Sequence, residues 1–128
     1  MNNTDKSTFG THLILDLKCC DNTLLKDYNL VFNVLSELPE KIGMTKITQP
    51  YVFPYSGLIP EDKGITGIVI IAESHISIHT FQEKEYCFID IFSCKHFDIE
   101  YATQFLIQLF KPKIYDINCI KRGKGFKQ

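Results

Sequence analysis

The chain has 128 residues, a length that suits one domain spanning residues 1–128 with a single core. Hydrophobic residues make up 45 %, charged residues 23 %, and the net charge is −1, which argues against a general nucleic-acid or membrane-surface partner. The polar start and the absence of an apolar stretch of about 20 residues predict neither a secretion signal nor a membrane span. We therefore expect a cytoplasmic protein.

The cysteines show no pairing pattern. The chain has five of them, an odd number, and two are adjacent. No spacing indicates a disulfide framework or a CxxC metal ribbon, which is typical of a protein from a reducing compartment. The five are Cys19, Cys20, Cys87, Cys94 and Cys119.

The first third of the chain predicts a polar arm, a strand and one helix. Residues 1–8 are polar, and residues 12–17 alternate weakly between apolar and polar. Apolar side chains then recur three and four apart over residues 24–35, which predicts an amphipathic helix. Residues 21–22 offer side chains that cap such a helix, and we expect it to end near Pro39.

The middle of the chain is rich in predicted strands. Residues 45–55 read as an extended segment, and their two prolines favour an edge position in a sheet. Residues 56–64 form a loop. Three strands are then predicted at residues 65–72, 75–81 and 86–93.

The last part of the chain predicts a helix, a strand and a basic tail. The helix begins at Asp98 or Glu100 and ends before Pro112, and a strand follows at residues 114–120. The tail, residues 121–128, reads as a solvated end. Two helices against one mostly antiparallel sheet make an α+β two-layer sandwich.

A serine lies between an acid and an imidazole where the apolar strand pattern of residues 68–71 ends, at Glu73-Ser74-His75. A nucleophile beside a potential base makes this a candidate chemical site. Side chains alternate between the two faces of a strand, so His75, Ser77 and His79 share one face. That face either lines a pocket or is a solvated outer face, and the pattern leaves both open.

Histidines and cysteines of this region also supply zinc ligand types. His75 and His79 are available together with Cys87 or Cys94. Two histidines four apart on a strand, however, are roughly 13 Å apart. That is too far for one tetrahedral metal with bonds of about 2 Å, so we predict no metal site.

The chain resembles the small prokaryotic S-adenosylmethionine decarboxylases over residues 9–120. The central signature is Glu-Ser-His, with a histidine five positions after the serine, a glutamate nine after it and a cysteine twenty after it. The matching motifs are Gly64-Ile65-Thr66-Gly67, Ile71-Ala72-Glu73-Ser74-His75-Ile76-Ser77-Ile78-His79-Thr80, Glu83, Asp90-Ile91-Phe92-Ser93-Cys94 and the early Gly10-Thr11-His12-Leu13-Ile14-Leu15-Asp16.

The resemblance implies an enzyme that makes its own pyruvoyl group. The hydroxyl of Ser74 would attack the carbonyl of Glu73, with Thr66 and His79 at the positions that assist processing. The chain would be cut into residues 1–73 and 74–128, and Ser74 would become the pyruvoyl group. That carbonyl would form a Schiff base with the substrate and act as an electron sink.

The resemblance also implies roles in turnover and substrate binding. Cys94 matches the proton donor, although a cysteine at the end of a strand is more often a small buried hydrophobe. Glu83 matches a carboxylate that contacts the ribose hydroxyls, although it also reads as a surface residue in a turn. Phe53 or Tyr55 can stack on adenine, with a core or edge role as the alternative.

The substrate and the assembly follow from the same resemblance. A homodimer of processed protomers in an α/β/β/α arrangement is implied, with pockets near the interface. We expect a small substrate of amino-acid type and weigh S-adenosylmethionine, used in spermidine synthesis, ahead of arginine or ornithine. A non-catalytic regulatory homologue remains an alternative, although a dead copy has no chemical need for Ser74, His79 and Cys94 together.

Overall fold

The structure is a computed structural model that describes residues 8–127. Of the polar arm predicted at residues 1–8, only Thr8 lies within this range. The strands are β1 (Gly10–Lys18), β2 (Thr45–Lys46), β3 (Tyr51–Tyr55), β4 (Gly64–Ala72), β5 (Ser74–Phe81), β6 (Tyr86–Ser93) and β7 (Ile114–Arg122). The helices are α2 (Asn22–Leu25), α3 (Tyr28–Lys41) and α4 (Ile99–Phe110), and a 3-10 turn, η1, covers Pro60–Asp62.

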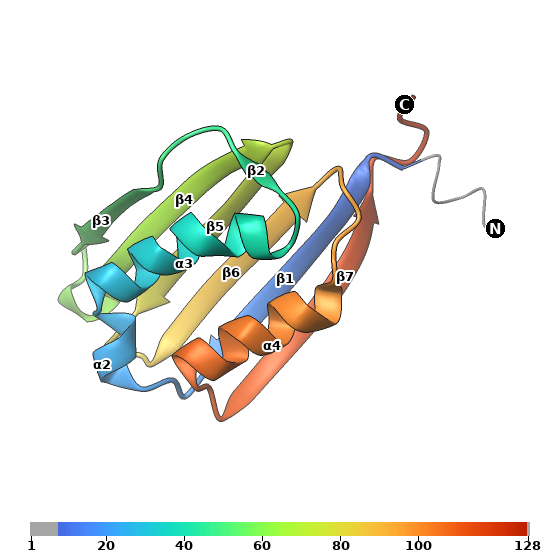
Figure 1. The fold of residues 1–128 in the computed structure, drawn as a ribbon. Coiled ribbons are helices and arrows are strands. Elements are labelled where there is room, and N and C mark those ends of the chain that lie inside the picture. Colours follow the sequence, from blue (N-terminus) through green and yellow to red (C-terminus); the bar gives the residue numbers. More distant parts are fainter. Residues whose placement is uncertain (1–7, 128) are drawn as a thin grey trace.

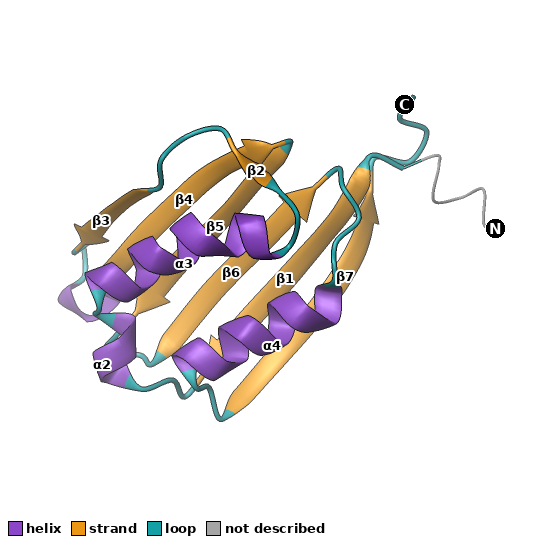
Figure 2. Cartoon of the chain, viewed as in Figure 1, coloured by secondary structure: helices purple, strands orange, loops and turns teal. Residues whose placement is uncertain are grey.

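The strands form one seven-stranded sheet in the order β2-β4-β5-β6-β1-β7, with β3 also paired to β4. All of these pairings are antiparallel. The helices lie on one face of the sheet (Figures 1 and 2). The predicted α+β two-layer sandwich is therefore confirmed. Within residues 8–127, no helix has the length and apolar character needed to cross a membrane.

The single helix expected over residues 24–35 was wrong in one respect, because the structure has two helices there. The short α2 is capped by Asp21, whose carboxylate accepts from the backbone N–H of Thr23 at 2.9 Å. The carboxylate of Asp27 then accepts from Leu30 N–H at 3.1 Å and starts α3. Because Asp27 is a second N-cap within the amphipathic stretch, it ends the first helix and allows a new helix to begin in another direction. Pro39 lies inside α3, which continues to Lys41.

The last helix agrees with its prediction. Asp98 is the N-cap of α4, and its carboxylate accepts from Tyr101 N–H at 3.0 Å. The helix ends at Lys111, whose φ of 52° is left-handed. A residue in this conformation stops a helix by turning the chain away from its axis.

The core lies between the helices and the facing side of the sheet. Alternate residues of the central strands are fully buried there, and each buried Leu or Ile contributes about 1.5–3 kcal/mol. Gly67 lets α3 approach β4 closely, since a Cβ at this position would lie 2.7 Å from Cδ1 of Leu35. The fully buried apolar strand residues are Leu13, Leu15, Leu17, Val69, Ile71, Ile76, Ile78, Cys87, Ile89 and Ile91.

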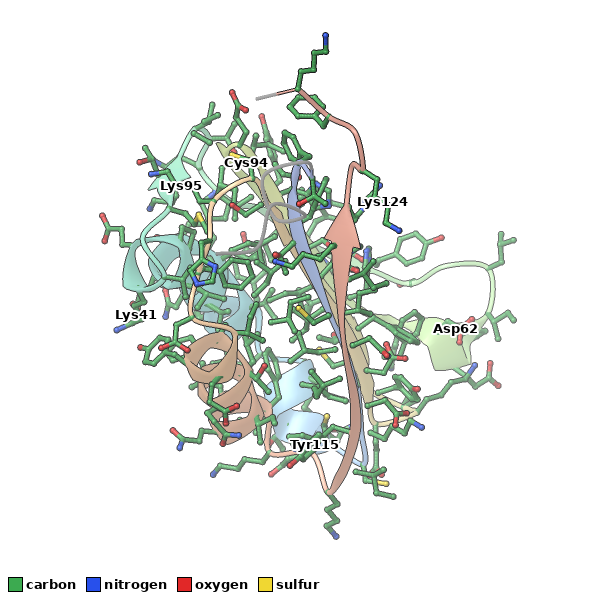
Figure 3. All side chains as sticks on the ribbon, turned by 90° about the vertical axis from the view of Figure 1, so that its right-hand side faces the viewer. Lys41, Asp62, Cys94, Lys95, Tyr115 and Lys124 are labelled. Carbon is green, nitrogen blue, oxygen red and sulfur yellow. The ribbon has the colours of Figure 1, made fainter. Side chains whose placement is uncertain are left out.

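No described helix covers the opposite face of the sheet. The edge-on view shows the helices on one side, with Asp62 of η1 on the other side (Figure 3). Phe88 is 37 % exposed and His79 is also exposed, although both lie on inner strands. We call this surface the open face. It is the surface that the expected α/β/β/α dimer would cover.

The basic tail is partly ordered onto the sheet. Strand β7 extends to Arg122, beyond the predicted end at residue 120. The chain then turns at Gly123, whose φ is +80°, and the ring of Phe126 meets that of Phe9 edge-on at 5.0 Å. Part of the expected solvated end therefore folds back over the start of β1.

Candidate active site

The serine singled out from the sequence starts β5 at a tight turn. Only Glu73 separates β4 from β5, and its side chain is exposed. Ser74 has a φ of 125°, a conformation that non-glycine residues rarely adopt. Such backbone conformations cost about 1–3 kcal/mol and cluster at functional sites. The peptide bond between Glu73 and Ser74 therefore lies at a strained and accessible point.

Cys94 lies against this turn. Strand β6 ends at Ser93, which is opposite Ser74 in the β5–β6 register. The next residue, Cys94, donates its backbone N–H to the carbonyl oxygen of Glu73 at 3.3 Å. Two residues twenty-one apart in the sequence thus meet at one end of the sheet because their strands are neighbours. The Cys94 side chain is half-buried.

The loop that carries Cys94 is held by the serine before it. The Ser93 hydroxyl is buried, accepts from Lys95 N–H at 3.0 Å and donates to Sδ of Met44 at 3.2 Å. These two bonds tie the first residues of the loop to the core. Cys94 is therefore presented by a well-anchored turn.

Thr66, His79 and Phe53 form a second group. Thr66 is directly opposite His79 in the β4–β5 register, and Phe53 is opposite Thr66 in the β3–β4 register. Residues opposite one another in antiparallel strands point to the same face, here the open face. Phe53 is 49 % exposed.

These two groups do not meet within one chain. Ser74 and His79 are five residues apart on β5, which corresponds to about 16 Å of strand. Glu83 is farther still, exposed in the turn between β5 and β6. The predicted processing residues are therefore divided between two ends of the sheet. Glu73 and Ser74 lie at the start of β5, whereas Thr66 and His79 lie near its other end, together with the predicted substrate-binding residue Phe53.

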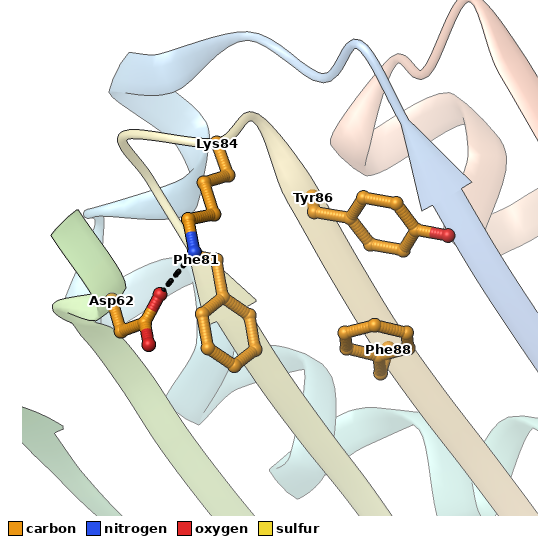
Figure 4. Close-up of a pocket in the computed structure, with 5 residues that line it drawn as sticks. All are labelled: Asp62, Phe81, Lys84, Tyr86 and Phe88. Atoms are coloured by element: carbon orange, nitrogen blue, oxygen red, sulfur yellow. Dashed lines mark hydrogen bonds and ion pairs between the residues drawn. The ribbon is translucent and has the colours of Figure 1, made fainter. Parts of the chain in front are cut away.

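A pocket of about 300 Å³ opens beside the second group (Figure 4). Phe81 and Phe88 meet edge-on at 5.8 Å, and Tyr86 stacks on Phe88 at 4.6 Å. Lys84 and Asp62 form an ion pair of 2.6 Å at its rim. Sequence reasoning did not assign these aromatics to a site. The strand alternation that put His79 on the open face would also have put Phe81 and Phe88 there.

Polar side chains also gather at the middle of the open face. His12 Nε2 and Asp90 Oδ1 are 2.8 Å apart, and the hydroxyl of Ser77 donates to Asp90 Oδ2 at 3.5 Å. His75, Ser77 and His79 are alternate residues of β5, and none of them is buried, whereas Ile76 and Ile78 between them are fully buried, as the shared face predicts. Among residues 8–127, no three His, Cys, Asp or Glu side chains gather in a way that could hold a metal ion.

Two of the remaining cysteines are chemically shielded. Burial raises the pKa of the Cys20 thiol to about 12, and burial also raises the pKa of Cys87. All five cysteines are free thiols. Because the thiolate is the reactive form, Cys20 and Cys87 are poor candidates for chemistry.

The profile of the S-adenosylmethionine decarboxylase family matches residues 11–123. The chain belongs to this family. It is 33 % identical to the S-adenosylmethionine decarboxylase proenzyme of Pyrococcus furiosus, an alignment that covers 91 % of this chain and 80 % of that one. The proenzyme of Methanococcus aeolicus is 37 % identical, with 89 % and 93 % covered.

A solved structure supports the same relationship. The adenosylmethionine decarboxylase of Aquifex aeolicus superposes with a TM-score of 0.80 at 27 % identity, covering 95 % of this chain and 97 % of that chain. Family membership thus agrees with the resemblance inferred from Glu73, Ser74, His79 and Cys94.

Proposed function

We propose that the protein cleaves itself between Glu73 and Ser74, turns Ser74 into a pyruvoyl group and decarboxylates S-adenosylmethionine. The product would be the aminopropyl donor for spermidine synthesis. The observation that carries this proposal is the contact of Cys94 with Glu73 at the β4–β5 turn, in a chain of the S-adenosylmethionine decarboxylase family. We also propose that the enzyme is cytoplasmic. Its five cysteines are free thiols, which suits a reducing compartment.

The turn carries the nucleophile, the carbonyl that it would attack and one hydrogen-bond donor to that carbonyl. Oγ of Ser74 bonds to the carbonyl carbon of Glu73, the C–N bond breaks, and an ester forms. Negative charge develops on the Glu73 carbonyl oxygen, where the Cys94 N–H already donates at 3.3 Å. Loss of the proton on Cα of Ser74 then expels the Glu73 carboxylate. The elimination separates fragments 1–73 and 74–128 and leaves an enamine at residue 74. Water hydrolyses this enamine, ammonia is released, and a ketone remains.

The residues at this turn fit the pyruvoyl group that the family implies. When present, the group supplies an electron sink for the electrons released with carbon dioxide. The Cys94 thiol lies on the loop beside it and is the candidate that returns a proton to the α-carbon. Glu83 is the candidate acceptor for the ribose hydroxyls, and the rings of Phe53 or of the Phe81–Tyr86–Phe88 pocket offer flat surfaces for adenine.

A homodimer would complete this site. Within one chain Thr66, His79 and Glu83 are too far from Ser74 to act on it, and the open face is uncovered. Two copies packed through their open faces, with strands running in opposite directions, would bring the Ser74 end of one copy to the Glu83 end of the other. A two-fold axis makes two identical sites of this kind. We therefore propose that each active site combines residues of both copies.

S-adenosylmethionine is favoured over arginine and ornithine, because the relatives in Pyrococcus furiosus and Methanococcus aeolicus carry its name. The intact mass of the purified protein tests self-cleavage, with Ser74→Ala as the uncut control. Wild type should give two fragments, the second blocked at its amino end. A single uncut wild-type chain would favour a non-catalytic homologue. Carbon dioxide release from arginine or ornithine alone would overturn the substrate assignment.

A further inference from the structure

His75 is the histidine that touches Ser74. Its Nδ1 lies 3.3 Å from the Ser74 hydroxyl oxygen, whereas His79 is about 16 Å away along the same strand. A serine hydroxyl must lose its proton to attack a carbonyl, and an adjacent imidazole is a common base for that step. The sequence comparison with the family assigned assistance to His79 and Thr66 and left His75 without a role.

Neighbouring rings hold the His75 imidazole. Phe92 of β6 is opposite His75 in the register, and the two rings meet edge-on with centroids 6.1 Å apart. Phe92 is itself fixed, since the guanidinium of Arg122 lies 4.2 Å over its ring and Phe9 packs against it at 5.5 Å. The half-buried imidazole therefore has a defined position beside the hydroxyl, as a base requires.

We propose that His75 is the general base of the first step of self-cleavage, an inference that rests on the proposed function. The Ser74 hydroxyl proton moves to Nδ1 of His75 as Oγ bonds to the carbonyl carbon of Glu73. The carbonyl π electrons move to the oxygen that Cys94 N–H contacts. On collapse the C–N bond breaks, and the imidazolium returns the proton to the freed nitrogen of Ser74. The imidazole ends neutral, ready for the next step.

Time-resolved cleavage tests this role. The full chain is made by cell-free translation with labelled methionine, which marks only the uncut chain and fragment 1–73, because both methionines, Met1 and Met44, lie there. His75→Asn keeps an acceptor near the hydroxyl but cannot take a proton at neutral pH. We expect its cleavage to slow about 10²–10⁴-fold. His96→Asn is the matched control, because His96 is exposed and follows Cys94 in the loop.

Hydroxylamine and imidazole show whether His75 acts in the first step, the formation of the ester. Hydroxylamine cuts an ester but leaves an ordinary peptide bond, so the uncut His75→Asn chain should resist it. Added imidazole should restore cleavage in His75→Ala. Cleavage of His75→Asn within threefold of wild type would overturn the proposal, and so would hydroxylamine cleavage of its uncut chain. Failure of rescue in a His75→Ala chain with wild-type circular dichroism would also overturn it. Failure of wild type itself to cleave would instead refute the proposed function.

Discussion

The backbone N–H of Cys94 lies 3.3 Å from the carbonyl oxygen of Glu73 and donates a hydrogen bond to it. The backbone N–H of Cys94 thus contacts the turn, and the same residue carries the thiol proposed as a proton donor. The donor is aimed at the carbonyl that Ser74 is proposed to attack, and the thiol would act later, in turnover. This division makes the two functions of Cys94 separable by mutation.

Replacing Cys94 with alanine should leave self-cleavage intact and abolish most turnover. Alanine keeps the backbone N–H but removes the proposed proton donor, so carbon dioxide release should fall about 10²–10⁴-fold. Mass spectrometry measures the cleavage, and labelled S-adenosylmethionine measures turnover. Cys119→Ala is the control, since Cys119 is exposed on β7. Normal turnover by Cys94→Ala would remove the thiol from its role.

The Ser74→Ala variant should rescue cleavage of the His79→Ala variant if the site spans the dimer. Ser74→Ala lacks the nucleophile and His79→Ala lacks the distant histidine, so neither should cleave well alone. In a mixed dimer, the His79→Ala chain keeps its own Ser74 and receives the histidine of the other copy. Co-expression should therefore yield fragments 1–73 and 74–128 from the His79→Ala chain alone, which its mass identifies. A mixture that stays uncut would place all processing residues within one chain.

A charge on the open face should separate the copies. Ile68 of β4 is half-buried there, opposite Ser77 in the β4–β5 register. Burying an unpaired carboxylate in an interface is strongly unfavourable, so Ile68→Glu should give a monomer by light scattering and should cleave poorly. Leu58→Glu adds the same charge to a fully exposed loop residue and should stay dimeric. A dimeric Ile68→Glu protein would move the interface elsewhere.

The buried thiols should make the fold sensitive to alkali. Burial raises the pKa of Cys20 to about 12 and also raises that of Cys87, from an ordinary value of about 8.5. The unfolded chain therefore releases these protons first as the pH rises. These two thiols should not change the free energy of unfolding below about pH 8 and should lower it between about pH 8.5 and 12.

Urea titrations at a series of pH values measure this effect. In Cys20→Ala the slope above about pH 8.5 should be shallower than in wild type, whatever the absolute stability of the variant. The Cys119→Ala variant is a suitable control, because Cys119 is exposed on β7. Equal slopes in wild type and Cys20→Ala would contradict the shielding of this thiol.

Local patterns were enough for most of the elements. An apolar run predicted strand β4, and alternation with a period of two predicted β5 and β6, all within one residue of their observed ends. Asp98, one of the two predicted starts of the last helix, is the N-cap of α4. The break between α2 and α3 was not predicted, because the helical spacing of apolar residues continues across it. The role of Asp27 as an N-cap is visible only in the folded structure. Hydrophobic periodicity predicts which face of an element is buried but does not predict such interruptions.

The candidate site divides in the same way. The resemblance picked out Ser74, Cys94, His79 and Glu83 without indicating where they lie relative to one another. The register then placed Cys94 beside Glu73, and placed His79 beside Thr66 far from the serine. The contact of His75 with Ser74 is local in sequence, yet its ring position depends on Phe92 of the next strand.

The order of residues alone determined the family, the α+β class and the candidate nucleophile, because strand periodicity and a specific motif are carried by neighbours along the chain. Only the tertiary structure decided that one copy holds half of the proposed site at each end of β5. Ser74 and His79 are five residues apart on an extended strand, so the rise of the backbone separates them by about 16 Å. No local sequence pattern predicts which residues lie close to Ser74 instead. A second copy packed on the uncovered face is the partner proposed above to close this gap.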